Sequence, residues 1–169
     1  MNNFESLFAA YPCVLTDESV KAMVAEILAE HFNENNNIEV WKQCLHSIDL
    51  TTLNGDDTTE KVETMAQRVN EFEEKFPGVP NVAAMCVYPA LVQTASDTLT
   101  EPIGIAAVAA GFPASQTFIE VKVAEAAMAV AAGATEIDIV ISIGKFLEGN
   151  YQEVFDEISE IKAAIKDAH

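Results

Sequence analysis

Strand-like and helical segments alternate along most of this chain, and this alternation limits its possible folds more than any other feature. Short apolar strand candidates lie at residues 48–51, 82–88, 103–109 and 136–141, and a helical pattern follows each one. Such alternation favours a parallel sheet, because parallel neighbours need a crossover helix. The strands recur about every 30 residues, the spacing of an eight-stranded α/β barrel of about 250 residues. The sequence therefore predicts an α/β fold of four βα units, which is half of such a barrel.

A doubly wound open sheet is the rival arrangement, but its fingerprint G-x-G-x-x-G follows none of the strand candidates. Several residues predict where the helices begin and end. Pro89 can open the second helix at its first position, Gly133 should end the third, and Tyr151 should lie at the start of the fourth. The first helix should run as far as Pro77-Gly78, since apolar residues recur on one face of it up to that point: Val62, Met65, Val69, Phe72 and Phe76.

Residues 1–45 are predicted to be helical and to lie outside this repeat. Thr16 is a plausible N-cap before Asp17 and Glu18, and apolar residues then recur at helical spacing from Val20 to Leu28. The run Asn35-Asn36-Asn37 should break that helix, and a short helix over 38–45 should follow. The expected organisation is an N-terminal helical extension, 1–45, followed by the half-barrel, 46–169.

Charge excludes several classes of partner. The chain carries 27 acidic against 9 basic residues, a net charge of −18, and its only arginine is Arg68. Nucleic-acid surfaces need clustered Lys and Arg, so we expect no nucleic-acid partner, and an anionic membrane surface is disfavoured for the same reason. We interpret the acidity as a source of solubility.

Cysteine usage and the N-terminus predict a cytoplasmic protein. Cys13, Cys44 and Cys86 have no C-x-x-C spacing, which is typical of a reducing compartment. The first residues lack a signal-peptide pattern, and no uninterrupted apolar run is long enough to span a membrane. The three histidines, His31, His46 and His169, lack ligand spacing, so a metal site is not expected. We expect no cofactor.

Asp138 is the most informative polar residue, because it interrupts an apolar strand. Alternation places Ile137, Ile139 and Ile141 on one face and Asp138 on the other, which would point into a barrel lumen. A buried carboxylate there is costly unless it is paired. Proton transfer would explain its presence, and a structural ion pair is the alternative.

Three other residues are weaker candidates. Asp49 lies in the first strand candidate before Thr51-Thr52-Leu53-Asn54, so it is either a site residue or part of turn chemistry. Cys86 in the second strand is expected to act as a small apolar residue. Lys145 follows the fourth strand and is expected to be a solvated surface group. No lysine stands out as a desolvated amine beside a second cation, which is the arrangement that makes an amine nucleophilic.

Together, the strand-end motifs resemble those of the deoxyribose-phosphate aldolases. The resemblance is carried by Ile48-Asp49-Leu50-Thr51-Thr52-Leu53-Asn54, by Cys86-Val87-Tyr88-Pro89, by Gly111-Phe112-Pro113 and by Gly133-Ala134 with Glu136-Ile137-Asp138. The helix starts at Asp57-Thr58-Thr59-Glu60 and Gly149-Asn150-Tyr151 fit as well. These motifs occur in order and at family spacing over about residues 46–169.

The resemblance implies a TIM (β/α)8 barrel in the cytoplasm that needs no metal. Its reaction is the reversible cleavage of 2-deoxy-D-ribose 5-phosphate to D-glyceraldehyde 3-phosphate and acetaldehyde through a lysine Schiff base. Asp138 matches the family's proton-relay aspartate, and Asp49 matches an aspartate of the same polar network. Cys86 matches a thiol near the substrate that turnover does not require, and Leu53 would form an apolar wall near the aldehyde.

This sequence departs from the family pattern by what it lacks. The family's Schiff-base lysine lies on the sixth strand and its partner lysine on the seventh, followed by the phosphate-binding loops, and these 169 residues contain four strand candidates. The first hypothesis is therefore an aldolase fragment that is inactive alone. The second is a half-barrel that serves as a binding or assembly module without chemistry, and the third is a complete enzyme of another kind that uses Asp138 and Asp49 as an acid–base pair.

Self-association is expected from the half-barrel architecture. Half a barrel has two unpaired sheet edges, one near Asp49 and the other near Asp138, and it leaves apolar surface uncovered. We expect a homodimer or another homo-oligomer.

Overall fold

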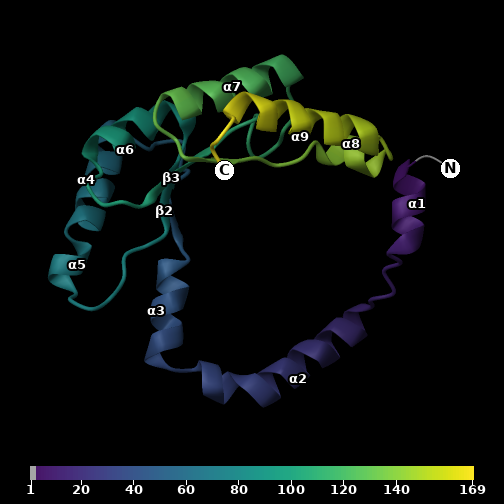
Figure 1. Ribbon diagram of the computed structural model, residues 1–169, viewed down its shortest axis with the longest axis horizontal. Helices are drawn as coiled ribbons and strands as arrows, with labels where there is room; N and C mark the ends of the chain where they lie inside the picture. Colours follow the sequence, from purple (N-terminus) through teal and green to yellow (C-terminus); the bar gives the residue numbers. More distant parts are fainter. Residues whose placement is uncertain (1–2) are drawn as a thin grey trace. The chain divides into compact units, whose positions relative to one another are not determined.

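A computed structural model describes residues 3–169 of the chain (Figure 1). It divides into two compact units, Met1–Cys44 and Leu45–His169, which are described separately.

The first unit is helical, with α1 (Asn3–Ala10), α2 (Asp17–Asn35) and most of α3 (Ile38–His46). Thr16 caps α2 as predicted: its hydroxyl accepts the backbone N–H of Ser19 at 3.2 Å, and the Ser19 hydroxyl accepts that of Thr16 at 2.9 Å. α2 ends at Asn35, within the predicted asparagine break. None of the residues of α2, all of which the structure describes, is buried. Its apolar residues are therefore largely open to solvent.

The second unit is built on a parallel sheet of four strands in the order β1-β2-β3-β4, as predicted. The strands are β1 (Asp49–Thr51), β2 (Ala84–Val87), β3 (Gly104–Val108) and β4 (Glu136–Asp138). The elements between and after them are α4 (Thr59–Asn70), α5 (Phe72–Lys75), the 3₁₀ turn η1 (Pro89–Leu91), α6 (Val92–Thr98), α7 (Ile119–Ala131), α8 (Ile143–Leu147) and α9 (Tyr151–Ile165).

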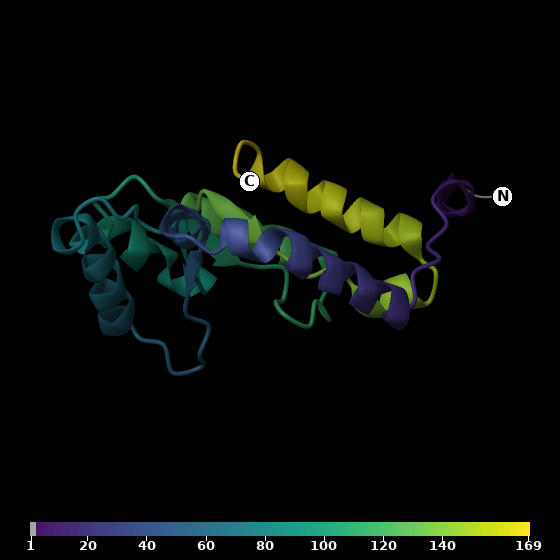
Figure 2. The same cartoon turned by 90° about the horizontal axis from the view of Figure 1, so that it is seen from below.

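Helices cover one face of this sheet. Met85, Val87, Ile105 and Ala107 point to that face and form a buried core with side chains from α4, α6 and α7. α9 lies beside α7, and their shared core includes Ala126 and Ile161 (Figures 1 and 2). The opposite face carries a smaller buried cluster of Cys86, Ala106 and Val108, against which Leu53, Tyr88 and Phe112 pack. In a closed barrel this second face would line the lumen.

Most strand ends lie within two residues of the prediction, and two boundaries differ by more. The fourth strand was expected to reach residue 141 but ends at Asp138, which pairs with Val108, the last residue of β3. Beyond that pair the chain after β3 turns away, with positive φ at Ala110 and Gly111, so β4 has no neighbour to continue along.

The helix expected to run to Phe76 breaks after Asn70. The side-chain amide of Asn70 donates to the carbonyl of Thr98 at 2.9 Å and accepts the N–H of Thr100 at 2.9 Å. These bonds fix the end of α4 to the last residue of α6 and to the loop that follows it, and Phe72 begins the separate helix α5. The third helix ends as predicted, because Gly133 has a φ of +113° and an added Cβ there would lie 2.6 Å from the Ser96 hydroxyl oxygen.

Candidate functional site

Asp138 ends β4 on the sheet face opposite the helices. The predicted alternation is correct, since Ile137 packs into the helix-covered core while Asp138 points the other way. Its carboxylate Oδ2 lies 3.7 Å from the thiol Sγ of Cys86, which donates to it. The expectation that Asp138 is buried is wrong for this chain, because its side chain is exposed. It therefore bears no large desolvation cost here.

Cys86 lies in the middle of β2 on the same face and is only 2% exposed. Burial raises the pKa of its thiol to about 11, and the charge of Asp138 and the hydrogen bond to it act in the same direction. The charge of Asp49 adds to the rise, while a hydrogen bond with Thr51 opposes it. The thiol is therefore protonated at neutral pH, which makes Cys86 a hydrogen-bond donor and not a thiolate nucleophile.

The structure brings the other two predicted site residues to this face. Asp49 begins β1, directly opposite Ala84 in the β1–β2 register, and is exposed. Leu53 follows β1 and packs against the cluster that contains Cys86. We refer to Asp49, Leu53, Cys86 and Asp138 as the lumen-face group. The structure shows that these four residues share one face, and their roles stay predictions.

The turn after β1 forms a polar cluster that sequence reasoning treated only as a turn. The Asp57 carboxylate accepts from the Thr52 hydroxyl at 2.9 Å, from the Asn54 N–H at 2.9 Å and from the Lys61 ammonium. The Lys61 bond is the main reason that the pKa of Asp57 falls to about 2, although burial opposes it. Turn chemistry in this segment therefore centres on Asp57, while Asp49 lies outside the cluster.

A second polar network was missed by the sequence analysis. The ammonium of Lys122, which is 1% exposed, donates to the Ser142 hydroxyl at 2.7 Å and to the Glu157 carboxylate Oε2 at 3.1 Å. Ser142 in turn donates to the same carboxylate oxygen at 2.6 Å. Lys145 donates to the other oxygen, Oε1, at 2.6 Å. Lys122, Ser142, Lys145 and Glu157 are called the α7–α9 network below, after the two long helices that it joins.

Charge in the α7–α9 network is balanced around Glu157. Burial raises the pKa of Glu157, but hydrogen bonds from Lys145, Ser142 and Lys122 together outweigh it and lower the pKa to about 2. The pKa of Lys145 is raised, first by its bond to Glu153 and then by its bond to Glu157. Lys122 is a buried lysine that the sequence did not single out, and it shares the Glu157 carboxylate with Lys145. Both amines are ion-paired, which disfavours nucleophilic attack.

The signal that could have revealed this network is helical spacing. Lys122 shares the buried stripe of α7 with Ala126 and Ala129. Glu157 shares that of α9 with Val154 and Ile161. One basic and one acidic residue in facing apolar stripes indicate a buried pair.

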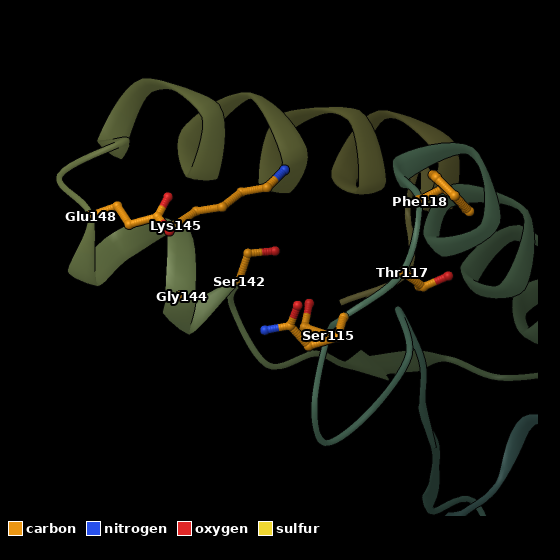
Figure 3. A pocket seen from close by; sticks show the side chains of 8 residues that line it. Ser115, Thr117, Phe118, Ser142, Gly144, Lys145 and Glu148 are labelled. Carbon is orange, nitrogen blue, oxygen red and sulfur yellow. The ribbon is translucent and has the colours of Figure 1, made fainter.

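A cavity of about 400 Å³ opens beside this network (Figure 3). Figure 3 shows Ser142 between the 115–118 loop and α8, with Lys145 extending toward α9. The polar lining of this cavity offers hydroxyl, amide and charged groups: Ser115, Gln116, Thr117, Ser142, Lys145 and Glu148. Among residues 3–169 no group of His, Cys, Asp and Glu side chains is arranged to hold a metal ion. Within the same range, no helix is both long and apolar enough to cross a membrane.

Comparison with known proteins gives the family. Residues 44–169 match the family model described as DeoC/LacD family aldolase. Human deoxyribose-phosphate aldolase is 38% identical over 139 residues, which cover 72% of this chain and 42% of the human protein. A relative from Caenorhabditis elegans is 35% identical over 156 residues, covering 90% of this chain and 51% of that protein.

Solved structures agree with the sequence matches. A protein described as QR15, an aldolase, superimposes with a TM-score of 0.65 at 28% identity, over 73% of this chain and 52% of that one. The tetrameric deoxyribose phosphate aldolase from Aeropyrum pernix shares the fold, with a TM-score of 0.59 at 22% identity over 78% of this chain and 53% of that one. The chain spans about half the length of the curated relatives it matches. The parallel half-barrel with its lumen-face group, together with the family match over three quarters of the sequence, shows that the chain belongs to the DeoC/LacD family of aldolases.

Proposed function

We propose that this chain supplies the N-terminal half of an aldolase active site for 2-deoxy-D-ribose 5-phosphate. The reaction would be cleavage to D-glyceraldehyde 3-phosphate and acetaldehyde through a lysine Schiff base. The observation that carries this proposal is the convergence of the lumen-face group on one face of the sheet, with Asp138 at the carboxyl end of its strand. Active sites of these barrels are built at that end.

Within this proposal Asp138 transfers protons. Its carboxylate is exposed on the lumen side, so a substrate or water can reach it. Cys86 donates a hydrogen bond to Asp138 and Leu53 offers apolar contact for the two-carbon aldehyde. Asp49 would contribute to the same polar network, since its charge acts on the Cys86 thiol.

We further propose that the 169 residues alone do not turn over substrate. The family's two active-site lysines belong to the sixth and seventh strands, and the two lysines of the α7–α9 network are ion-paired with Glu157. Incubation with deoxyribose 5-phosphate and borohydride, followed by mass spectrometry, tests this. We expect neither a reduced adduct nor product, and an adduct on Lys122 or Lys145 with turnover would contradict the proposal.

The aldolase function is tested by supplying the missing half. The chain is mixed with the C-terminal half-barrel of the human relative, and borohydride-trapped adduct and aldehyde product are measured. We expect both to depend on this chain. Asp138→Asn should lower the rate about 10²–10⁴-fold, as expected for the loss of a general acid–base group. Asp156→Asn, on the outer helix α9, is the matched control and should leave the rate unchanged. A rate within about threefold of wild type for Asp138→Asn would reduce Asp138 to a structural residue.

A non-catalytic assembly module is the second candidate, favoured by the uncovered apolar surface. Val24, Ile27 and Leu28 of α2 are 49%, 56% and 54% exposed, and Trp41 of α3 is 55% exposed. Surfaces of this kind bind partners, and we propose a homodimer or larger homo-oligomer. Light scattering at micromolar concentration should give a multiple of 18.3 kDa, and a monomer that unfolds cooperatively would contradict this. Turnover by the isolated chain that is lost in Asp138→Asn would instead favour an acid–base enzyme that uses Asp138 and Asp49.

We also propose a cytoplasmic location, which is supported by the free thiols at Cys13, Cys44 and Cys86. Mass spectrometry after alkylation of cell extract should find all three cysteines reduced, and a disulfide between any two would contradict this.

A further inference from the structure

We propose that Lys122 is a positioning residue for Asp138, acting through Ser142 and the segment that joins them. This inference rests on the proposed function, because Asp138 matters only if the lumen-face group acts on substrate. It concerns a network that lies on the other side of the strand from the reacting groups.

Residues 139–142 connect Asp138 of the lumen-face group to Ser142 of the α7–α9 network. The segment begins directly after Asp138, where β4 stops pairing with β3, so the sheet no longer holds it. At its far end Ser142 is 6% exposed and precedes the short helix α8. Ile139 packs against the core between α7 and α9. Apolar contact is non-directional, and it does not by itself fix the path of the segment.

Two hydrogen bonds of the Ser142 hydroxyl fix the path of this segment. The hydroxyl accepts a hydrogen bond from Lys122 and donates one to Glu157, at 2.7 Å and 2.6 Å. The two partners come from α7 and α9, so the hydroxyl is held from both helices at once. Hydrogen bonds to charged groups are short and directional. The position of the far end of the 139–142 segment is therefore set by Lys122 and Glu157.

At the near end of the segment, the Asp138 carbonyl accepts the N–H of Ala109 at 2.9 Å, which holds the backbone of Asp138 beside β3. Its side chain meets only the Cys86 thiol in the hydrogen bonds that the structure describes. A shift of the 139–142 segment would therefore rotate or displace the carboxylate with little resistance from its own side-chain contacts.

Cys86 provides a readout of the Asp138 position that requires no catalysis. The groups that act on its thiol are Asp138 from β4, with Asp49 and Thr51 from β1. Displacement of Asp138 would remove a like charge and an acceptor of the S–H bond, and both changes favour the thiolate. The pKa of Cys86 should then fall.

The experiment uses the full chain with Cys13→Ser and Cys44→Ser, which remove the two exposed thiols. The ¹³Cβ shift of labelled Cys86 is followed by NMR against pH. Asp138→Asn removes the carboxylate charge and should lower the pKa of the Cys86 thiol. The size of this shift is the reference for the other variants. We expect Lys122→Met to lower this pKa by at least about half as much. Ser142→Ala, which keeps the Lys122–Glu157 pair, should lower it in the same direction.

Lys75→Met is the matched control, since it removes a lysine from an exposed pair with Glu71 in α5. It should leave the Cys86 pKa unchanged. If Lys122→Met does not fold, the Cys86 pKa in Ser142→Ala alone tests the proposal. A Cys86 pKa that stays at its wild-type value in the folded Lys122 and Ser142 variants, while Asp138→Asn lowers it, would overturn the proposal. An unchanged pKa in Asp138→Asn would also overturn it, by removing the contact on which it stands. These outcomes do not depend on whether the chain takes part in an aldolase, so the two proposals can fail separately.

Discussion

Replacing Lys122 by methionine removes one charge from the α7–α9 network while keeping most of the side-chain volume. Lys122 is 1% exposed, and its side chain is the largest that is fully buried among the described residues. Methionine is unbranched and apolar, so it can fill the space of the lysine stem. The substitution therefore tests the polar contribution with little change in packing.

The expected loss of stability depends on the hydrogen bonds that Glu157 keeps in this variant. Removing one partner from a buried ion pair typically costs about 3–5 kcal/mol when the other charge is left uncompensated. Here Glu157 retains the Lys145 ammonium and the Ser142 hydroxyl, each at 2.6 Å. The cost should lie nearer that of one charge-assisted hydrogen bond, about 1.5–3 kcal/mol. We expect the free energy of unfolding to fall by about 2–3 kcal/mol, a large part of the 5–15 kcal/mol of an ordinary domain.

Urea unfolding followed by circular dichroism measures this change. With a slope of about 2 kcal/mol per molar urea, the midpoint should fall by roughly 1–1.5 M. Lys75→Met is the control. Because the Lys75–Glu71 pair is exposed, this variant should change the stability by less than about 0.5 kcal/mol. A Lys122→Met change within about 0.5 kcal/mol of wild type would refute the reasoning, since that is the effect of an ordinary surface substitution.

Two further predictions concern pH and helix capping. Because the pKa of Glu157 is about 2 in the folded state and ordinarily 4.5, its contribution to stability is present above about pH 4.5 and is lost as pH falls toward 2. Urea midpoints measured from pH 6 to pH 2.5 should fall less steeply in Glu157→Gln, and equal slopes would argue against an ionised, paired Glu157. Thr58 caps α4 by accepting the Lys61 N–H at 3.2 Å. Thr58→Ala should therefore cost about 1 kcal/mol in the same assay, whereas Thr58→Ser should be nearly neutral; equal stability of the two variants would contradict a capping role.

Local patterns were sufficient to predict the architecture. The alternation of short apolar runs with helical spacing determined a parallel sheet of four strands, since period and connection length depend only on nearby residues. The N-cap at Thr16 and the helix stop at Gly133 were also readable, because side-chain capping and a positive φ are local requirements. The side of the sheet that Asp138 faces followed from strand alternation for the same reason.

Contacts between distant segments had to come from the tertiary structure. Asp138 and Cys86 are 52 residues apart, and their contact depends on how β2, β3 and β4 are aligned. The end of α4 was set by bonds between Asn70 and residues at and just after the end of α6, about 30 residues further on, which helical periodicity does not reveal. Asp138 was expected to be buried, yet half a barrel leaves it open to solvent, because its burial depends on what covers that face.

The pairing of Lys122 with Glu157 is the sharpest example. A lysine in an apolar stripe can extend its ammonium to the surface or bury it against a partner, and sequence spacing does not distinguish the two. The partner lies 35 residues away, and only the packing of α7 on α9 places the two groups together. The sequence by itself therefore determined the order of elements and the face on which each strand residue lies, because these depend on local geometry. The tertiary structure decided which charges meet and which are left in water, because those outcomes depend on the distance between segments that the chain brings together only when it folds.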